Sequence, residues 1–267
     1  MLLSPKLYVM DLQIKDQLFI VCGASGGFGR AVSELLVLEG AQVIAVARNE
    51  QNLQLFAAKT LGQVTSLSCD ITQPGSIGKV LEAVNNRQVH GVLVNAGGPP
   101  AMAAMETKLE DWDNAYKTLL RWKIDLTQRL VPAMIESNYG RFVYIESASV
   151  KQPIENLALS NSIRLAVVGY IKTLSQEISK HGVNLNVLAP GFHYTGALDR
   201  IINKNRDLHG MTDEDSLKQF ASQTSVKRVG KPEDFASLAL WLLSPHSRYI
   251  TGQTISVDGG SIRGVMG

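Results

Sequence analysis

The sequence predicts an α/β fold, in which a doubly wound parallel sheet of about seven strands carries helices on both faces. Short runs rich in β-branched residues alternate with helical patterns of a dozen or more residues, as in successive βαβ units. Several of the strand candidates are apolar throughout, which is typical of strands covered on both faces. With 267 residues, 45% of them hydrophobic, the chain is long enough to bury the core of such a domain.

The elements follow one another in a regular order. The expected strands are 18–22, 42–47, 64–69, 91–95, 140–145, 183–188 and 254–257. The expected helices are 27–39, 49–59, 74–84, 110–134, 157–180 and 232–243. We interpret 1–9 as an N-terminal extension and 10–267 as a single domain, because no internal repeat or linker divides it. The more polar segment 195–229 is expected to be a substrate lid, although a surface excursion fits its pattern nearly as well.

Composition narrows the choice of partners and compartment. Lys and Arg total 26 against 24 Asp and Glu, so neither nucleic acid nor an anionic membrane is indicated as a partner. No apolar run is long enough to span a membrane, and the N-terminus lacks the pattern of a secretory signal. We therefore expect a cytoplasmic protein in which Cys22 and Cys69 are reduced rather than joined. No metal site is expected.

A glycine-rich turn joins the first expected strand to the first helix. It contains Gly23, Ser25, Gly27, Phe28 and Gly29. Glycines permit a tight turn and let the backbone approach a pyrophosphate, whose charge the helix N-terminus favours. The order of strand, turn, helix and second strand predicts a Rossmann-type dinucleotide site, whereas a glycine cluster alone would also fit a purely structural turn.

Arg48 directly follows the second expected strand, near the position where NAD-binding proteins of this type carry an acidic residue. The nearest acidic residue, Glu50, lies beyond the strand end. A guanidinium is suited to bind a 2′-phosphate through charge-assisted hydrogen bonds. We therefore predict NADP(H) as the cofactor; the alternative is an exposed arginine at a helix start.

Several motifs in order resemble those of the short-chain dehydrogenase/reductase family. Gly23, Gly27 and Gly29 match the pattern T-G-x-x-x-G-x-G, with Cys22 in place of the threonine. The later matches are Asp70-Ile71, Asn95-Ala96-Gly97, Pro190-Gly191 with Thr195, and Asp258-Gly259-Gly260. The resemblance extends over the chain from Met10 onward.

The resemblance implies roles for these residues in binding the cofactor. Asp70 and Ile71 would flank the adenine, and Asn95, Ala96 and Gly97 would pack beside the adenosine ribose. Pro190, Gly191 and Thr195 would wrap the nicotinamide amide and phosphate. The long helices 110–134 and 157–180 would pair between subunits, which implies a homodimer or a homotetramer.

The family's catalytic set is a tyrosine with a lysine four residues later, an upstream serine and an asparagine. Ser147 matches the serine, but the tyrosine position falls on Ser160, the lysine position on Arg164 and the asparagine position on Leu119. An alkyl hydroxyl is a weaker acid than a phenol by about six pKa units, or roughly 8 kcal/mol. Ser160 is therefore expected to hydrogen-bond a carbonyl but not to protonate it. Arg164 could stabilise an oxyanion or bind ribose hydroxyls, and would also serve as a cofactor contact.

Three functions fit this pattern. The first is an NADP(H)-dependent oxidoreductase with a non-standard catalytic site, reducing a carbonyl or enone of a small organic substrate. The second is a catalytically inactive NADP(H)-binding sensor or partner protein, and the third is lyase or isomerase chemistry with Lys151 or His193 as acid or base.

Neighbouring residues offer candidates for the missing proton donor. Lys151, His193 and Tyr194 could each replace the tyrosine, or could be solvated or line a wall. Glu146 adjoins Ser147 but is expected to point to the other side of the strand, because neighbouring strand residues alternate in direction.

Overall fold

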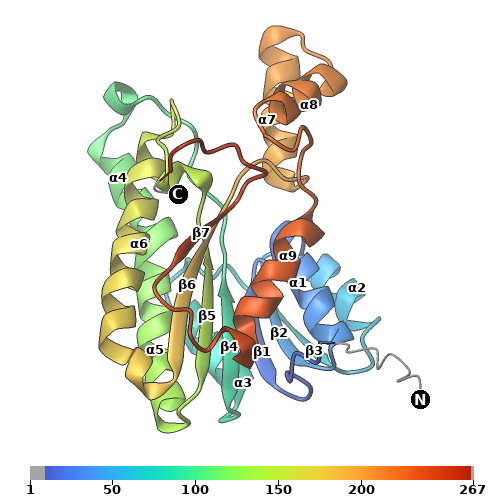
Figure 1. Cartoon of the computed structure of the whole chain (residues 1–267), viewed down its shortest axis with the longest axis vertical. Helices are drawn as coiled ribbons and strands as arrows, with labels where there is room; N and C mark the ends of the chain where they lie inside the picture. The colour runs from blue at the N-terminus through green and yellow to red at the C-terminus, as the bar shows by residue number, and fades with distance from the viewer. Residues whose placement is uncertain (1–9, 266–267) are drawn as a thin grey trace, which may run out of the picture.

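The computed structural model describes residues 10–265 and places seven parallel strands in one sheet (Figure 1). The strand order is β3-β2-β1-β4-β5-β6-β7, so the chain reverses its direction of winding between β1 and β4. The strands are β1 (Leu18–Cys22), β2 (Gln42–Ala47), β3 (Val64–Ser68), β4 (Val89–Val94), β5 (Gly140–Ile145), β6 (Val183–Pro190) and β7 (Thr254–Val257). The doubly wound sheet is confirmed, while the extension proposed for 1–9 lies outside the described residues.

Helices cover both faces of this sheet. One layer contains α1 (Gly27–Leu38), α2 (Glu50–Ala57) and α9 (Pro232–Leu243), which share a buried apolar cluster with the strands. The opposite layer contains α3 (Ser76–Val84), α5 (Trp122–Glu136) and α6 (Ala158–Ile178), with a second cluster of similar extent. Figure 1 shows the sheet between these two layers. The two cores explain why the central strands are apolar throughout: each must bury side chains on both faces.

The prediction of one continuous α-helix over 110–134 is wrong. The structure divides it into α4 (Leu109–Tyr116), a π-helical turn (Lys117–Arg121) and α5. The indole nitrogen of Trp122, the first residue of α5, donates to the carbonyl of Thr118 in the turn at 2.8 Å, an acceptor that a regular α-helix would use for its own backbone. Thr118 also lies in the wall of the large cavity at the carboxyl ends of the strands.

The polar segment 195–229 forms two helices that project beyond the carboxyl ends of the strands, at the top of Figure 1. These are α7 (Gly196–His209) and α8 (Asp213–Ser222). They pack on a small apolar cluster of their own, which includes Leu198, Ile202 and Phe220.

The two cysteines are not joined in the structure. Cys22 and Cys69 are free, as expected, and burial raises the pKa of the Cys22 thiol to about 12. Within residues 10–265, no helix is both long and apolar enough to cross a membrane.

Close packing of β4 gives a first prediction. A Cβ atom on Gly91 would lie 2.7 Å from the ring of Phe19 on the neighbouring strand, so Gly91→Ala should lower the free energy of unfolding by about 1–3 kcal/mol. The matched control is Gly78→Ala in α3, where a Cβ meets nothing within 4 Å. That change should stabilise the protein by about 0.5–1 kcal/mol, since alanine favours helix. Urea unfolding measures both, and a stable Gly91→Ala protein would contradict the packing described here.

Candidate active site

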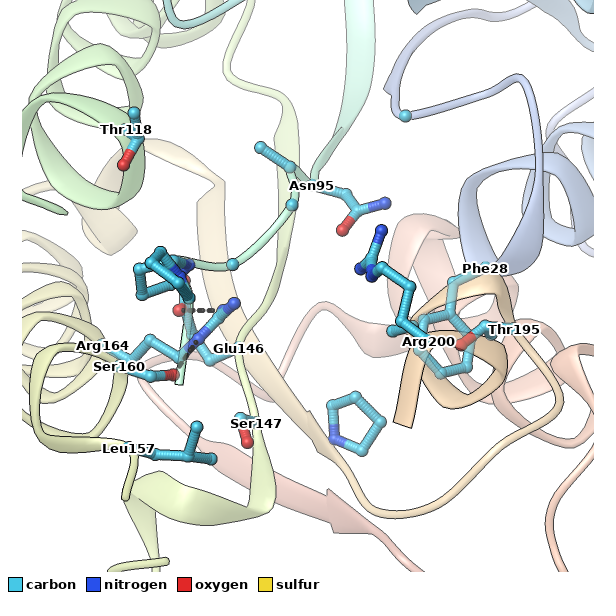
Figure 2. Close-up of a pocket in the computed structure, with 18 of the residues that line it drawn as sticks. Phe28, Asn95, Thr118, Glu146, Ser147, Leu157, Ser160, Arg164, Thr195 and Arg200 are labelled. Carbon is cyan, nitrogen blue, oxygen red and sulfur yellow. Dashed lines mark hydrogen bonds and ion pairs between the residues drawn. The ribbon is translucent and has the colours of Figure 1, made fainter. Parts of the chain in front are cut away.

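The carboxyl ends of the strands open into one continuous cavity of about 1480 Å³ (Figure 2). Its position, around the point where the winding reverses between β1 and β4, is the usual place for a ligand in an open parallel sheet. Residues that line it come from the strand ends, from the segment after β5, from α4 and α6, and from α7. Sequence segments far apart in the chain therefore meet in one space.

The glycine turn after β1 forms part of the cavity wall. Gly23 and Gly27 have φ values of 72° and 53°, in the left-handed region that favours glycine. A Cβ on Gly29 would lie 2.4 Å from the carbonyl oxygen of Gly23, so only glycine lets α1 pack directly on the turn. Gly23, Ser25 and Phe28 line the cavity, whereas Gly27 and Gly29 shape the turn without lining it.

No side chain caps the N-terminus of α1, where Gly26 is the N-cap residue. The first backbone N–H groups of a helix lack partners within the helix, and together with the helix dipole they favour an anion. The turn therefore offers what a pyrophosphate requires: a close backbone approach and donors.

The other residues expected to contact the cofactor also line this cavity. They are Arg48, Asp70, Ile71, Asn95, Ala96, Gly97, Pro190, Gly191 and Thr195. Arg48 is exposed at the end of β2, beside the start of α2. The pKa of Asp70 is lowered, because hydrogen bonds from Thr72 and the charge of Arg48 outweigh the partial burial that opposes ionisation. The exposed guanidinium of Arg48 and the carboxylate of Asp70 therefore both lie on the cavity wall, at the carboxyl ends of the strands.

Ser147, Ser160 and Arg164 lie together on the wall of the cavity opposite Phe28 and Thr195 (Figure 2). Ser147 follows β5, and its Oγ accepts a hydrogen bond from the backbone N–H of Ser149 at 3.1 Å. Its hydroxyl hydrogen therefore remains available to a ligand. Ser160 and Arg164 are one turn apart on α6, and the Nε of Arg164 donates to the Oγ of Ser160 at 3.0 Å.

Glu146 points to the side of β5 that faces α5 and α6, as the alternation of strand side chains predicts, yet it takes part in the site. Its carboxylate accepts a hydrogen bond from Nη1 of Arg164 at 2.9 Å. Phe142 and Tyr144, the preceding residues on this side of β5, belong to the buried cluster shared with α5 and α6, so the alternation continues to Glu146. Glu146 is fully buried, as the partner of Arg164 requires.

Lys123 on α5 is a further member of the site that the sequence analysis missed. Its ammonium group forms a buried ion pair with the other carboxylate oxygen of Glu146. Burial lowers the pKa of Lys123, the charge of Glu146 raises it, and the charge of Arg164 lowers it. The available signal was a lysine on the apolar stripe of a helix, between Leu119 and Leu126, where a solvated charge does not belong.

The three residues considered as substitutes for the tyrosine proton donor differ in their position relative to the cavity. Of Lys151, His193 and Tyr194, only His193 lines the cavity. Its Nδ1 lies 3.2 Å from the carbonyl of Gly191, its ring packs edge-on against Phe28, and burial lowers its pKa. His193 is therefore mainly neutral at pH 7 and part of the wall. Within residues 10–265, no group of three or more His, Cys, Asp or Glu side chains could hold a metal ion.

Comparison with known proteins identifies the family of this chain. The family model described as "Enoyl-(Acyl carrier protein) reductase" matches residues 23–261. The chain belongs to the short-chain dehydrogenase/reductase family. Among curated relatives, the 3-oxoacyl-[acyl-carrier-protein] reductase of Thermotoga maritima is 30% identical over 258 residues, covering 94% of this chain and 100% of the relative. The enzyme of the same name from Escherichia coli strain K12 is 28% identical over 251 residues, covering 93% and 98%.

Solved structures of this short-chain dehydrogenase/reductase fold superpose closely on the chain. L-sorbose reductase from Gluconobacter frateurii, complexed with NADPH and L-sorbose, matches with a TM-score of 0.90 and 25% identity, over 96% of this chain and 100% of that one. YwfH, an NADPH-dependent reductase involved in bacilysin biosynthesis, matches with a TM-score of 0.87 and 25% identity, over 94% and 100%. The relatives are reductases, and this chain is an oxidoreductase by family.

The shared carboxylate gives a prediction about stability. Glu146→Gln leaves Lys123 and Arg164 as two buried cations without a counter-charge, and should lower the free energy of unfolding by about 3–5 kcal/mol. The control is Asp125→Asn, which removes the exposed partner of Arg129 and should cost less than about 1 kcal/mol. Urea unfolding at low salt measures both variants. Equal stabilities for the two would show that Glu146 does not compensate the buried cations.

Proposed function

We propose that the protein is an NADP(H)-dependent reductase of a carbonyl or enone in a small organic substrate, with a catalytic site that lacks the family's tyrosine, lysine and asparagine. The observation that carries this proposal is the continuity of one cavity. The glycine turn lines one part of it, and Ser147, Ser160 and Arg164 line another. A dinucleotide on the turn would thus share a space with a substrate at Ser147.

The residues present fit NADP(H). The uncapped start of α1 favours a pyrophosphate, and Arg48 stands where a 2′-phosphate would need a cation. Asp70, Ile71 and the segment from Asn95 to Gly97 line the space between the strand ends, as contacts of an adenosine should. The titles of two similar structures name NADPH with those proteins. When bound, this cofactor supplies or accepts the hydride.

The catalytic residues would act by orientation and charge rather than by donating a proton. The hydroxyl of Ser147 is free to donate to a substrate oxygen, because its own oxygen already accepts from Ser149. Ser160 holds Arg164 in the cavity wall, where its positive charge favours negative charge on that oxygen without a hydrogen bond to it. An enone suits such a site better than a ketone, since the enolate left by hydride addition is a weaker base than an alkoxide and takes its proton from water.

A non-catalytic NADP(H)-binding sensor or partner is the second candidate. The observation in its favour is that no described side chain in the cavity replaces the tyrosine as an acid. Lys151 and Tyr194 lie outside the cavity lining, and burial lowers the pKa of His193. Both candidates require cofactor binding, so turnover separates them.

The remaining parts of the proposal concern the whole molecule. We place the protein in the cytoplasm as one domain, with α7 and α8 as a lid over the substrate. Ala197, Leu198 and Ile201 of α7 line the cavity, as a lid requires.

A homodimer or homotetramer would cover the exposed side chains of Tyr116 and Leu165 on the α4 and α6 side. Light scattering that gives a monomer at micromolar concentration would refute this assembly.

Cofactor preference provides the first test. The cofactor-free protein should bind NADPH at least about tenfold more tightly than NADH, and Arg48→Ala should remove that preference by weakening NADPH alone. The control is Arg87→Ala, which changes an exposed arginine between α3 and β4, at the opposite edge of the sheet. Titration of cofactor fluorescence gives the dissociation constants. Failure of both nucleotides to bind would reject the proposal in either form.

Turnover provides the second test. NADPH oxidation over a panel of ketones, quinones and enones should reveal activity that Ser147→Ala reduces by about 10²-fold or more and that Ser160→Ala largely retains. A proton-donating Ser160 would reverse that order, because its removal would then abolish the chemical step. Tight NADPH binding without turnover on any of these classes would favour the sensor.

A further inference from the structure

Beside the cavity lie three buried ionisable side chains, of which two are basic and one is acidic. Lys123, Glu146 and Arg164 form one cluster, in which both cations share a single carboxylate. Their side chains are 1%, 0% and 9% exposed, respectively. We call this cluster the buried triad. With every group ionised it holds one positive charge in excess.

Nothing else among the described residues compensates that excess. Within residues 10–265, Lys123 and Arg164 have no salt bridge to any acid except Glu146, although Asp70 and Asp111 also line the cavity. Cys22, the nearest ionisable thiol to Lys123, is uncharged, because burial raises its pKa to about 12. An uncompensated buried charge is costly, and burial lowers the pKa of Lys123. The excess is relieved either when Lys123 gives up its proton or when an anion binds, so an anion in the cavity favours the charged form of Lys123 and is itself favoured by it.

The guanidinium of Arg164 has one nitrogen left for that anion. Its Nε donates to Ser160, and its Nη1 donates to Glu146 at 2.9 Å. For Nη2 the structure gives no hydrogen-bond acceptor among residues 10–265. A Cβ on Gly98 would lie 3.3 Å from Nη2, so glycine at this position keeps that nitrogen open to the cavity. Figure 2 shows Arg164 and Glu146 side by side in the cavity wall.

We propose that the buried triad is a carboxylate-binding site and that the substrate is an organic acid, held by its carboxylate on Nη2 of Arg164. This inference rests on the proposed function only in taking the cavity as the substrate's. A carboxylate suits the site because its single charge equals the excess, whereas a phosphate dianion would exceed it. The substrate must already carry its negative charge when it binds, because the excess positive charge of the triad is present before any hydride is transferred. An enolate forms only during the reaction and would leave the excess charge of the free site uncompensated.

The test compares acids with their neutral isosteres. Calorimetry measures the binding of acrylate, crotonate and trans-cinnamate, and of the three corresponding amides, to NADP⁺-saturated protein. At least one acid should bind about tenfold or more tightly than its amide, as a charge-assisted hydrogen bond requires. In Arg164→Gln the acid should lose that advantage while the amide changes little. The Gln variant should remain folded, because Lys123 and Glu146 are left as a neutral pair.

Substitution of Lys123 tests the role of charge separately from direct contact with the ligand. It does not line the cavity, yet Lys123→Met removes the excess charge and leaves Glu146 paired with Arg164. Acid affinity should therefore fall several-fold with amide affinity unchanged, an effect that packing alone would not produce. The matched control is Arg129→Gln, an exposed arginine on the same helix α5 paired with Asp125, which should leave the preference intact.

The outcomes separate this inference from the proposed function. Equal binding of acid and amide, a preference that survives Arg164→Gln, or no acid binding at millimolar concentration would each overturn the carboxylate site. The same titrations on cofactor-free protein report on the triad even if NADP⁺ fails to bind, a failure that would reject the reductase proposal alone. A preference found in wild type and lost in both the Arg164 and Lys123 variants establishes the site.

Discussion

All seven strands of the sheet run parallel, so every strand ends at the same edge, and the functional part of the molecule depends on this constraint. Because the winding reverses between β1 and β4, the connections leaving those two strands diverge to opposite faces and leave a crevice between them. The glycine turn after β1, the segment after β4 and the end of β5 border that crevice. Residues as distant in sequence as Gly23 and Thr195 therefore share one cavity.

The two halves of the cavity rest on different physics. The half near β1 depends on backbone: glycines with positive φ, a helix start without a side-chain cap, and close packing of Gly29 on Gly23. The half near β5 depends on side-chain charge, and its central element is the Glu146 carboxylate that binds Lys123 and Arg164. The backbone half requires glycine at fixed positions, whereas the charged half depends on the pairing of three ionisable side chains.

The buried charges near β5 lower the stability of the fold but hold the side chains of the site in a fixed arrangement. Removing three ionised groups from water costs free energy that a single shared carboxylate only partly returns, and an apolar set of the same size would fold more stably. The same arrangement holds Arg164 in place through Ser160 and Glu146, so that its remaining nitrogen faces the cavity without further reorganisation. A fixed guanidinium differs in kind from the tyrosine typical of the family: it stabilises negative charge but retains its proton.

The sequence alone determined the features that depend on local pattern or on backbone. The bounds of β1, β2, β5 and β7 could be read from their apolar runs, and the glycine turn could be located because its geometry limits which residues fit. Tertiary structure decided the rest. Glu146 meets residues 23 and 18 positions away, and no local periodicity relates a strand end to two helices. The π-helical turn at Lys117–Arg121 also escaped the pattern, because the buried positions Ala115, Leu119, Trp122 and Leu126 keep the three- and four-residue spacing of a continuous helix. Which side chains fill the space between elements is determined by packing and by the pairing of buried charge, and both exist only in the folded chain.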